Sequence, residues 1–171
     1  KTTISLCKDG KYRITSENIY WSARETAFHG QKNLYQGSYD NCKDDLEKVL
    51  IGVLHGQSLS DVPLGVFLSG GIDSSIVAAL TQKISNQKIK TFSIGFKDKL
   101  YDESKYAEAV AKHLNTDHVT LFAKPKDAIN LIEKMPNVYS EPFADSSQIP
   151  TTLLANLVKK YVTVALSGDG G

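Results

Sequence analysis

The 171-residue sequence has little of what marks several classes of protein. Its two cysteines, Cys7 and Cys42, fit no metal-ligand spacing, so we interpret them as free thiols in a reducing compartment. No apolar run approaches the roughly 20 residues that a membrane span needs, and the first residues do not resemble a signal peptide. The net charge of +1 provides no excess of one sign for a large polyanionic partner. These absences predict a cytoplasmic protein without a nucleic-acid or membrane partner.

Two common phosphate-binding signatures are also missing. The sequence has no Gly-Lys-Ser/Thr of a Walker loop and no G-x-G-x-x-G dinucleotide fingerprint. It has instead a short apolar run, Leu64–Leu68, followed by a Ser-Gly-Gly turn at residues 69–71. Asp73, Ser74 and Ser75 come next, at the first turn of an expected helix, where unpaired N–H groups and the helix dipole favour an anion. This strand–turn–helix pattern predicts a phosphate site and resembles the PP-loop, SGG-x-DS, of the ATP pyrophosphatases; the alternative is a well-capped turn that binds nothing.

Strand and helix patterns alternate along the rest of the chain. An Asp-Gly turn at residues 9–10 predicts a hairpin of strands 2–6 and 12–20, and residues 21–39 are interpreted as a connecting segment. Expected helices cover 40–56, 72–84, 101–115 (capped by Asp102), 125–135 (stopped by Pro136) and a stretch from 147. Expected strands cover 64–68, 89–96, 118–122 and 161–166. Apolar stripes along the helices are expected to face inward. The members of these stripes are Leu46, Val49, Leu50, Val53, Leu54, Ile72, Ile76, Val77, Leu80, Ile84, Tyr106, Ala107, Val110, Ala111, Leu114, Leu153, Leu154, Leu157 and Val158.

This alternation predicts an α/β protein with an open parallel sheet and right-handed crossovers. Ligands of such sheets bind beyond the carboxyl ends of the strands, where the strand order reverses. Glycine-bearing loops follow the first and fourth strands of the sheet, and Gly95 ends the second, so a nucleotide crevice is expected there. His113 and His118 do not have the spacing of a metal pair and are interpreted as ordinary surface or core histidines.

Several stretches together resemble the synthetase domain of the glutamine-dependent asparagine synthetases. They occur in family order and read as follows: Tyr20-Trp21-Ser22, GVFLSGGIDSS at 65–75, TFSIGF at 91–96, Tyr101-Asp102-Glu103, EPFADSSQIPT at 141–151 and LSGDGG at 166–171. The resemblance implies a three-layer, Rossmann-like adenine nucleotide alpha hydrolase fold. It also implies a ligase that adenylates the side-chain carboxylate of aspartate, releases pyrophosphate, and passes the acyl group to ammonia derived from glutamine.

The resemblance also assigns roles to particular residues. Asp73 would hold Mg²⁺ against the pyrophosphate; the alternative role is a carboxylate that only favours the helix start. Asp169 stands where asparagine synthetases commonly have glutamate, near the attacking ammonia, and its shorter side chain leaves its role open. Glu141 and Asp145 are candidates for the acceptor pocket, although loop carboxylates often serve as caps. The implied ATP-binding residues are Leu68, Ser69, Gly70, Gly71, Asp73, Ser74, Ser75, Ile94, Gly95, Ser167 and Gly168.

The resemblance further implies that the chain is a piece of a longer enzyme. Family members carry an N-terminal glutaminase domain that begins with a catalytic cysteine, whereas Cys7 is not terminal. Residues 1–39 are interpreted as a lead-in from that domain, a partner within the same parent chain, and 40–171 as a synthetase domain truncated after its fourth strand. The 171 residues by themselves are expected to bind ATP weakly and not to make asparagine. A homodimer is compatible with the resemblance.

Two other functions stay open from the residues. One is another PP-loop enzyme that amidates or cyclises a different carboxylate. The other is a nucleotide-binding module that never exchanges pyrophosphate. The first would differ from the aspartate ligase in the carboxylate that it activates. The second would bind the nucleotide without catalysing a reaction.

Overall fold

The computed structural model describes residues 2–96, 102–141 and 144–169. The chain divides into two compact units, Lys1–Asp45 and Leu46–Gly171. Helix α2 (Tyr39–Gln57) contains the boundary between them. We describe each unit by itself.

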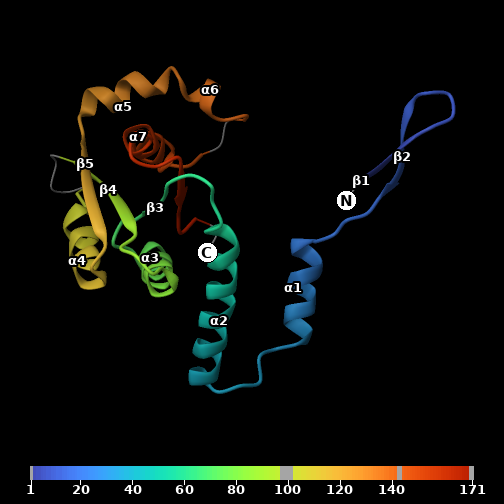
Figure 1. Ribbon diagram of the computed structural model, residues 1–171, viewed down its shortest axis with the longest axis horizontal. Helices are drawn as coiled ribbons and strands as arrows, with labels where there is room; N and C mark the ends of the chain where they lie inside the picture. Colours follow the sequence, from blue (N-terminus) through green and yellow to red (C-terminus); the bar gives the residue numbers. More distant parts are fainter. Residues whose placement is uncertain (1, 97–101, 142–143, 170–171) are drawn as a thin grey trace. The chain divides into compact units, whose positions relative to one another are not determined.

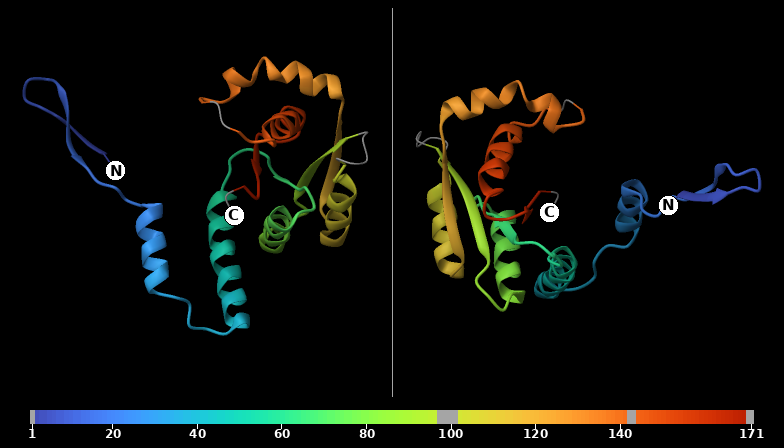
Figure 2. Two further views of the ribbon diagram at one scale, coloured as in Figure 1. Left: turned by 180° about the vertical axis from the view of Figure 1, so that it is seen from behind. Right: turned by 45° about the horizontal axis from the view of Figure 1, so that its top comes forward.

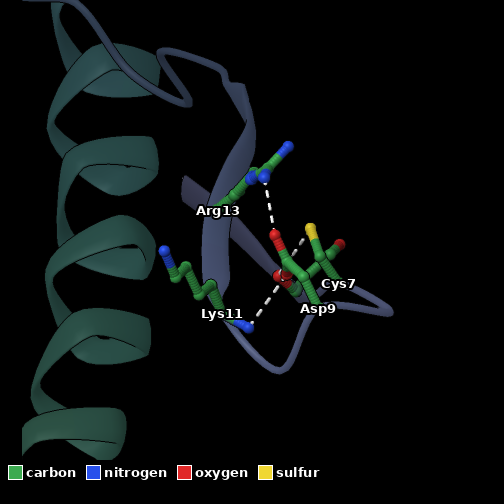
Figure 3. A network of polar contacts seen from close by, with 5 residues as sticks. Cys7, Asp9, Lys11 and Arg13 are labelled. Carbon is green, nitrogen blue, oxygen red and sulfur yellow. Dashed lines mark hydrogen bonds and ion pairs between the residues drawn. The ribbon is translucent and has the colours of Figure 1, made fainter.

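The first unit begins with the predicted hairpin, formed by β1 (Thr2–Leu6) and β2 (Tyr12–Glu17). The strands pair antiparallel, and Gly10 takes a left-handed φ of 75° in the connecting turn. The carboxylate of Asp9 closes this turn: it accepts a hydrogen bond from the backbone N–H two residues later (3.1 Å) and forms an ion pair with Arg13 (2.7 Å; Figure 3). The second strand ends at residue 17 and not at residue 20, because Glu17 is the partner of Thr2.

The segment interpreted as connecting contains a helix that was not predicted, α1 (Ala23–Lys32). The side chain of Ser22 caps this helix by accepting a hydrogen bond from the N–H of Glu25 (3.3 Å). The structure describes every residue of α1, and none of them is buried. The helix therefore needs no apolar stripe, and the sequence shows none. The serine followed three residues later by glutamate was the remaining signal of a helix start.

The second unit contains a parallel sheet of four strands (Figure 1). The strands are β3 (Leu64–Phe67), β4 (Lys90–Phe96), β5 (Asp117–Ala123) and β6 (Val164–Leu166). Their spatial order is β5-β4-β3-β6. The chain therefore moves outward from β3 through β4 to β5 and then returns to the other side of β3. This confirms the predicted open parallel sheet.

Helices cover both faces of this sheet and give the predicted three layers (Figures 1 and 2). Helices α3 and α4 pack on one face, and α7 packs on the other, where α5 lies against it. The helices of this unit after α2 are α3 (Ile72–Ile84), α4 (Ser104–Leu114), α5 (Pro125–Ile132), α6 (Met135–Val138) and α7 (Gln148–Val158).

Alternation along the strands divides the core between the two faces. Val66 and Leu68 pack with Ala78 and Ala107 on the side of α3 and α4. Phe92 packs with Leu154, Val158 and Val162 on the side of α7. Each face thus buries its own apolar cluster, as expected for a sheet covered on both sides.

Several predicted boundaries shift for local reasons. Strand β6 begins at Val164 because the N–H groups of Tyr161 and Val162 still bond to the carbonyl of Val158, which prolongs the turn after α7. Pro136 does not stop a helix but lies in the first turn of the short helix α6, where proline is tolerated. The position before α4 is Glu103, and Asp102 acts one residue earlier by accepting the N–H of Ser104 (3.2 Å). The predicted start of that helix at residue 101 lies outside the described residues.

Some of the predicted inward faces are wrong. On α2 the core contacts Leu50, Ile51 and Leu54, so the other half of a wide apolar stripe remains exposed. The ring of Tyr106 on α4 is also exposed, because Ala107 and Ala111 supply the face that approaches the sheet. The residues predicted inward but found exposed are Leu46, Val49, Val53, Ile72, Ile76 and Tyr106.

Candidate nucleotide site

The candidate site lies where β3 and β6 end. The two strands are parallel neighbours, with Val66 opposite Leu166, so the loops that follow them start at the same edge of the sheet. The strand order also reverses at this pair, because β4 and β5 lie on the far side of β3. A reversal of this kind leaves a crevice between two loops, which is where open α/β sheets bind ligands.

The loop after β3 is braced by its own serine side chains. The hydroxyl of Ser69 accepts the N–H of Gly71 (3.2 Å) and lies 2.9 Å from the hydroxyl of Ser74. The hydroxyl of Ser74 in turn accepts the N–H of Ser69 (3.2 Å), and Ser75 N–H donates to the carbonyl of Gly71 (3.1 Å). These bonds fix the turn before any ligand binds.

Gly70 satisfies two separate requirements of this turn. Its φ is +86°, a conformation that residues with a Cβ rarely adopt. A Cβ at this position would also lie 2.6 Å from Cβ of Tyr106 and 2.7 Å from the backbone nitrogen of Ala107. Helix α4 therefore packs directly behind the turn.

The loop after β6 contacts the beginning of α3. A Cβ on Gly168 would lie 2.9 Å from the backbone nitrogen of Ser74 and 3.0 Å from the backbone carbon of Asp73. Within this loop, Asp169 accepts the hydroxyl of Ser167 (3.3 Å) and donates its own N–H to that oxygen (3.3 Å). Residues separated by more than ninety positions in the sequence are thus brought into contact at the helix start.

The first turn of α3 offers the groups that a phosphate needs. The first N–H groups of an α-helix have no acceptor within the helix, and Gly71 precedes α3 without a side-chain cap. The hydroxyl of Ser75 is buried beside this turn and has no hydrogen-bond partner among the described groups. Buried hydroxyls normally have one, so the turn combines free donors with an unsatisfied polar atom. The arrangement suits an anion.

Asp73 gives this turn a single exposed carboxylate. No group of three or more histidine, cysteine or acidic residues gathers for a metal ion within the described part of the chain. A metal cage made of protein ligands is therefore not formed by these residues. Mg²⁺, however, commonly uses one or two carboxylates together with substrate phosphates, so Asp73 beside a phosphate-binding turn fits this ion.

A sequence model of the family described as asparagine synthase matches residues 45–171. The chain belongs to the asparagine synthase family. The resemblance inferred from the motifs is therefore confirmed, and the matched range includes the whole candidate site.

Relatives named as asparagine synthetases match most of the chain. A Methanocaldococcus jannaschii protein named for the glutamine-hydrolysing asparagine synthetases is 41% identical over 140 residues, 80% of this chain and 27% of the relative. The Bacillus subtilis protein "Asparagine synthetase [glutamine-hydrolyzing] 1" is 32% identical over 146 residues, 85% of this chain and 23% of the relative. Asparagine synthetase B [glutamine-hydrolyzing] of Escherichia coli is 28% identical, over 99% of this chain and 34% of the relative. The chain thus spans about a quarter to a third of the length of these relatives.

Solved structures with some similarity in fold include two synthetases. An NH3-dependent NAD synthetase from Campylobacter jejuni has a TM-score of 0.48 and 14% identity over 71% of this chain and 54% of its own. An NMN synthetase from Francisella tularensis has a TM-score of 0.49 and 17% identity over 71% of this chain and 52% of its own.

Three of the implied ATP-binding residues, Leu68, Ile94 and Gly95, lie in or beside the core. Leu68 is buried in the cluster shared with α3 and α4, and its N–H donates to the carbonyl of Phe92 (2.8 Å). The side chain of Ile94 packs toward α7, and Gly95 lies under the ring of Phe122. The side chain of Leu68 is thus not accessible to a nucleotide, and the role of Leu68, Ile94 and Gly95 stays a prediction.

The two candidates for the acceptor pocket differ in their surroundings. Asp145 accepts the N–H and the hydroxyl of Ser147, both at 2.8 Å, just before α7. These hydrogen bonds lower the pKa of the Asp145 carboxyl, and they make it a cap in this structure. Glu141 is exposed. Contact of either carboxylate with an acceptor substrate stays a prediction.

Sequence reasoning missed the contribution of α4 to the site. Tyr106 and Ala107 lie behind Gly70 with main-chain atoms and Cβ of Tyr106, so no chemically reactive group indicated them. The available signal was the spacing of Ala107 and Ala111, which gives α4 a small-residue face for close approach.

Two surface cavities lie elsewhere. One, of about 270 Å³, is lined by residues 17–21 and Thr2 of the first unit. The other, of about 460 Å³, lies where β3 and β4 begin, and its lining includes Leu64 and Lys90. Neither cavity is lined by residues 69–75 or 167–169, so the nucleotide crevice expected at this edge of the sheet stays a prediction.

Proposed function

We propose that this chain is the ATP-binding part of an AMP-forming amide ligase of asparagine synthetase type. Its parent enzyme would activate the side-chain carboxylate of aspartate and transfer it to ammonia, which a glutaminase domain of the same parent chain would release from glutamine. The observation that carries this proposal is the contact of Gly168 with the first turn of α3, because it brings both family motifs together at one edge of the sheet.

In the first step, a carboxylate oxygen of aspartate would attack the α-phosphorus of ATP, and the bond to the bridging oxygen would break. Pyrophosphate leaves with dense negative charge, so fixed donors that meet this charge lower the barrier. The N–H groups of Gly70, Gly71 and the α3 start, with the hydroxyls of Ser69, Ser74 and Ser75, would provide them. The loop at Ser167 and Gly168 would close the nucleotide from the opposite side.

Asp73 would hold Mg²⁺ next to the leaving pyrophosphate. The bound ion would neutralise part of the phosphate charge. Asp73 itself cannot stabilise a phosphate, since both carry negative charge. Its exposed position at the first turn supports this assignment over a purely local role at the helix start.

In the second step, the nitrogen of ammonia would attack the carbonyl carbon of the acyl-adenylate. The bond from that carbon to the AMP oxygen would break, and the nitrogen would lose a proton. Asp169 is the carboxylate of the LSGDGG motif and would accept that proton. Its N–H and carboxylate both bond to Ser167, which fixes the short loop in which it lies.

The experiment that tests the function is ATP–pyrophosphate exchange by the full-length protein with a panel of carboxylates. We expect labelled pyrophosphate to enter ATP when aspartate is present. Asp73→Asn should slow the exchange by about a hundredfold, the order of loss seen when one charge-stabilising group is removed. Asp117→Asn is the matched control, because Asp117 is exposed at the opposite end of the sheet, and it should exchange at the normal rate.

Exchange that depends on a carboxylate other than aspartate would support another PP-loop ligase and refute the aspartate assignment. Binding of ATP without exchange for any carboxylate would support a nucleotide-binding module. Either result would overturn the proposal as stated.

A further inference from the structure

A line of hydrogen-bonding side chains crosses the face of β4 and β5 that lies under α4. Such faces are normally apolar in a parallel sheet covered on both sides. Here Thr91 and Ser93 of β4 are 0% and 2% exposed and still carry hydroxyl groups. Their neighbours in the line include an imidazole and a carboxylate. Its members are Thr116, Thr91, His118, Ser93, Thr120 and Glu108.

His118 lies in the middle of this line and uses both ring nitrogens. Its Nδ1 is 2.9 Å from Oγ1 of Thr91, and its Nε2 is 3.1 Å from Oγ of Ser93. Beyond Thr91, the hydroxyl of Thr116 follows at 2.8 Å. Thr116 also reaches α4, because its N–H donates to the carbonyl of Ala111 (3.1 Å), and its hydroxyl lies 3.4 Å from the same oxygen.

The other end of the line determines the direction of its hydrogen bonds. The carboxylate of Glu108 can only accept, so the hydroxyl of Thr120 donates to it (2.9 Å). The hydroxyl of Ser93 then donates to Thr120 (3.4 Å), and its oxygen is left to accept from Nε2–H of His118. This places a proton on Nε2; in the neutral imidazole, Nδ1 then accepts from the hydroxyl of Thr91.

The surroundings of the ring favour this neutral form. Burial lowers the pKa of His118, and the nearby charge of Glu108 opposes that effect in part. Strand β4 presents only the uncharged Thr91 and Ser93 to the ring, while α4 presents Glu108. A proton on Nδ1 would reverse the hydrogen bond to Thr91, whose hydroxyl would then have to donate to Thr116, and would place a cation between the sheet and the helix.

The line fixes α4 at two points, Glu108 and Ala111, which both follow its contact with the Ser-Gly-Gly turn. Glu108 and Ala111 belong to α4, and Ala107 directly precedes Glu108. Ala107 is fully buried, and its backbone nitrogen is one of the atoms that a Cβ on Gly70 would meet. A shift of α4 along or away from the sheet would therefore move the surface that supports Gly70.

We propose that neutral His118 is a positioning residue for the nucleotide site: it completes the line of hydroxyls that holds α4, and α4 holds the Ser-Gly-Gly turn in its phosphate-binding shape. This inference rests on the proposed function, since it takes that turn to bind ATP. His118 touches no reacting atom. Its effect should appear in ATP affinity and in the pH dependence of that affinity.

The pH dependence follows from the fraction of molecules in which His118 is neutral. Below the pKa of this histidine, the competent fraction falls, and the apparent Kd for ATP rises in inverse proportion. The terminal phosphate of ATP titrates in the same pH range, so a pH profile of one protein is not sufficient. The comparison must be made between variants at each pH, because the titration of ATP then cancels.

The test measures the Kd for ATP in the full-length protein between about pH 5 and 8 by calorimetry, spanning the ordinary titration range of histidine. His118→Gln keeps a donor toward Ser93 and cannot titrate. Glu108→Gln keeps an acceptor for Thr120 but removes the charge that raises the pKa of His118. His113→Gln is the matched control, because His113 is an exposed histidine on the same helix.

We expect wild type and His118→Gln to bind ATP alike near pH 8. At the acid end, wild type should bind about threefold or more weakly relative to His118→Gln, as the neutral fraction falls. Glu108→Gln should move this loss to lower pH, and His113→Gln should follow wild type. A merely structural role would weaken binding equally at every pH.

Identical pH profiles for wild type and His118→Gln would overturn the inference and leave the proposed function intact. If His118→Gln fails to fold, an unchanged profile in Glu108→Gln overturns it in the same way. Wild-type protein that binds no ATP at any pH would overturn the proposed function, and the inference with it.

Discussion

At the scale of single residues, the site depends on glycines that allow backbone to approach backbone. Gly168 should not tolerate a methyl group, because three atoms of Ser74 and Asp73 lie within 3.1 Å of where its Cβ would be. The two loops would have to separate at the helix start. For Gly168→Ala we expect the Kd for ATP to rise by about tenfold to a hundredfold, the effect of misplacing a site by a fraction of an ångström to an ångström. Calorimetric titration of the full-length protein with ATP measures this change.

The matched control for this substitution is Gly52→Ala. Gly52 lies inside α2 and has open space where a Cβ would be placed. Alanine there should raise the free energy of unfolding by about 0.5–1 kcal/mol through helix propensity and leave ATP binding unchanged. Equal ATP affinity in Gly168→Ala and Gly52→Ala would mean that the loop after β6 does not contribute to ATP binding.

Single residues of the site were predictable where the backbone conformation permits only certain residue types. The Ser-Gly-Gly turn is an example, because a positive φ and a helix start leave a signature in the sequence. Tyr106 and His118 were not predictable in the same way. Tyr106 was expected inside together with Ala107 and Ala111, and of these three only the two alanines are buried. His118 was interpreted as ordinary because its partners come from other strands and helices, and such pairings are not visible in local spacing.

At the scale of elements, amphipathic helices that pack on the sheet were predicted well. Residues 153, 154 and 158 of α7 were expected inside and are buried against the sheet. Helix α1 was missed because its stability does not come from an apolar face. Boundaries shifted where a turn extended a helix, as at Tyr161, or where proline began one, as at Pro136. Apolar periodicity in the sequence thus indicates a buried face. It reveals a helix only where that helix buries such a face, which α1 does not.

The role of α7 as the cover of one sheet face gives a stability prediction. Leu154 is 8% exposed and packs with Phe92, Val158 and Val162. For Leu154→Ala we expect the free energy of unfolding to fall by about 3 kcal/mol, since large-to-small changes in a core cost 2–5 kcal/mol. Urea unfolding of the full-length protein, followed by a signal from this unit, measures the change.

Leu59→Ala provides the comparison for this substitution, because Leu59 is 84% exposed and loses few contacts. Its effect should stay within about 0.5 kcal/mol. Similar losses for the two leucines would contradict the packing of α7 on the sheet.

At the scale of the whole molecule, alternation of strands and helices predicted a parallel sheet but not its strand order. Every crossover can obey the right-handed rule with β6 on either edge of the sheet. The placement of β6 beside β3 depends on pairing between residues about a hundred positions apart, such as Val66 and Leu166. That pairing is what brings the loop at Ser167–Asp169 to the Ser-Gly-Gly turn, so the geometry of the site emerges only from the structure.

The predicted division of the chain into a lead-in and a synthetase domain, at residues 39 and 40, stays a prediction. Residues 1–39 as a lead-in from a glutaminase domain stay a prediction, as do the homodimer and the cytoplasmic location. Across 2–96, 102–141 and 144–169, no helix combines the length and apolar character required to cross a membrane. The family match begins at residue 45, and all residues of the candidate site lie within it.

The central claim is that the loops after β3 and β6 bind one ATP together. Hydrogen–deuterium exchange of the full-length protein with and without ATP tests it most directly, because exchange reports protection of individual backbone segments. The account predicts that ATP slows exchange at residues 70–75 and at 167–169 in parallel, with the hairpin of β1 and β2 unchanged. Protection confined to one of these loops, or located where β3 and β4 begin, would contradict it.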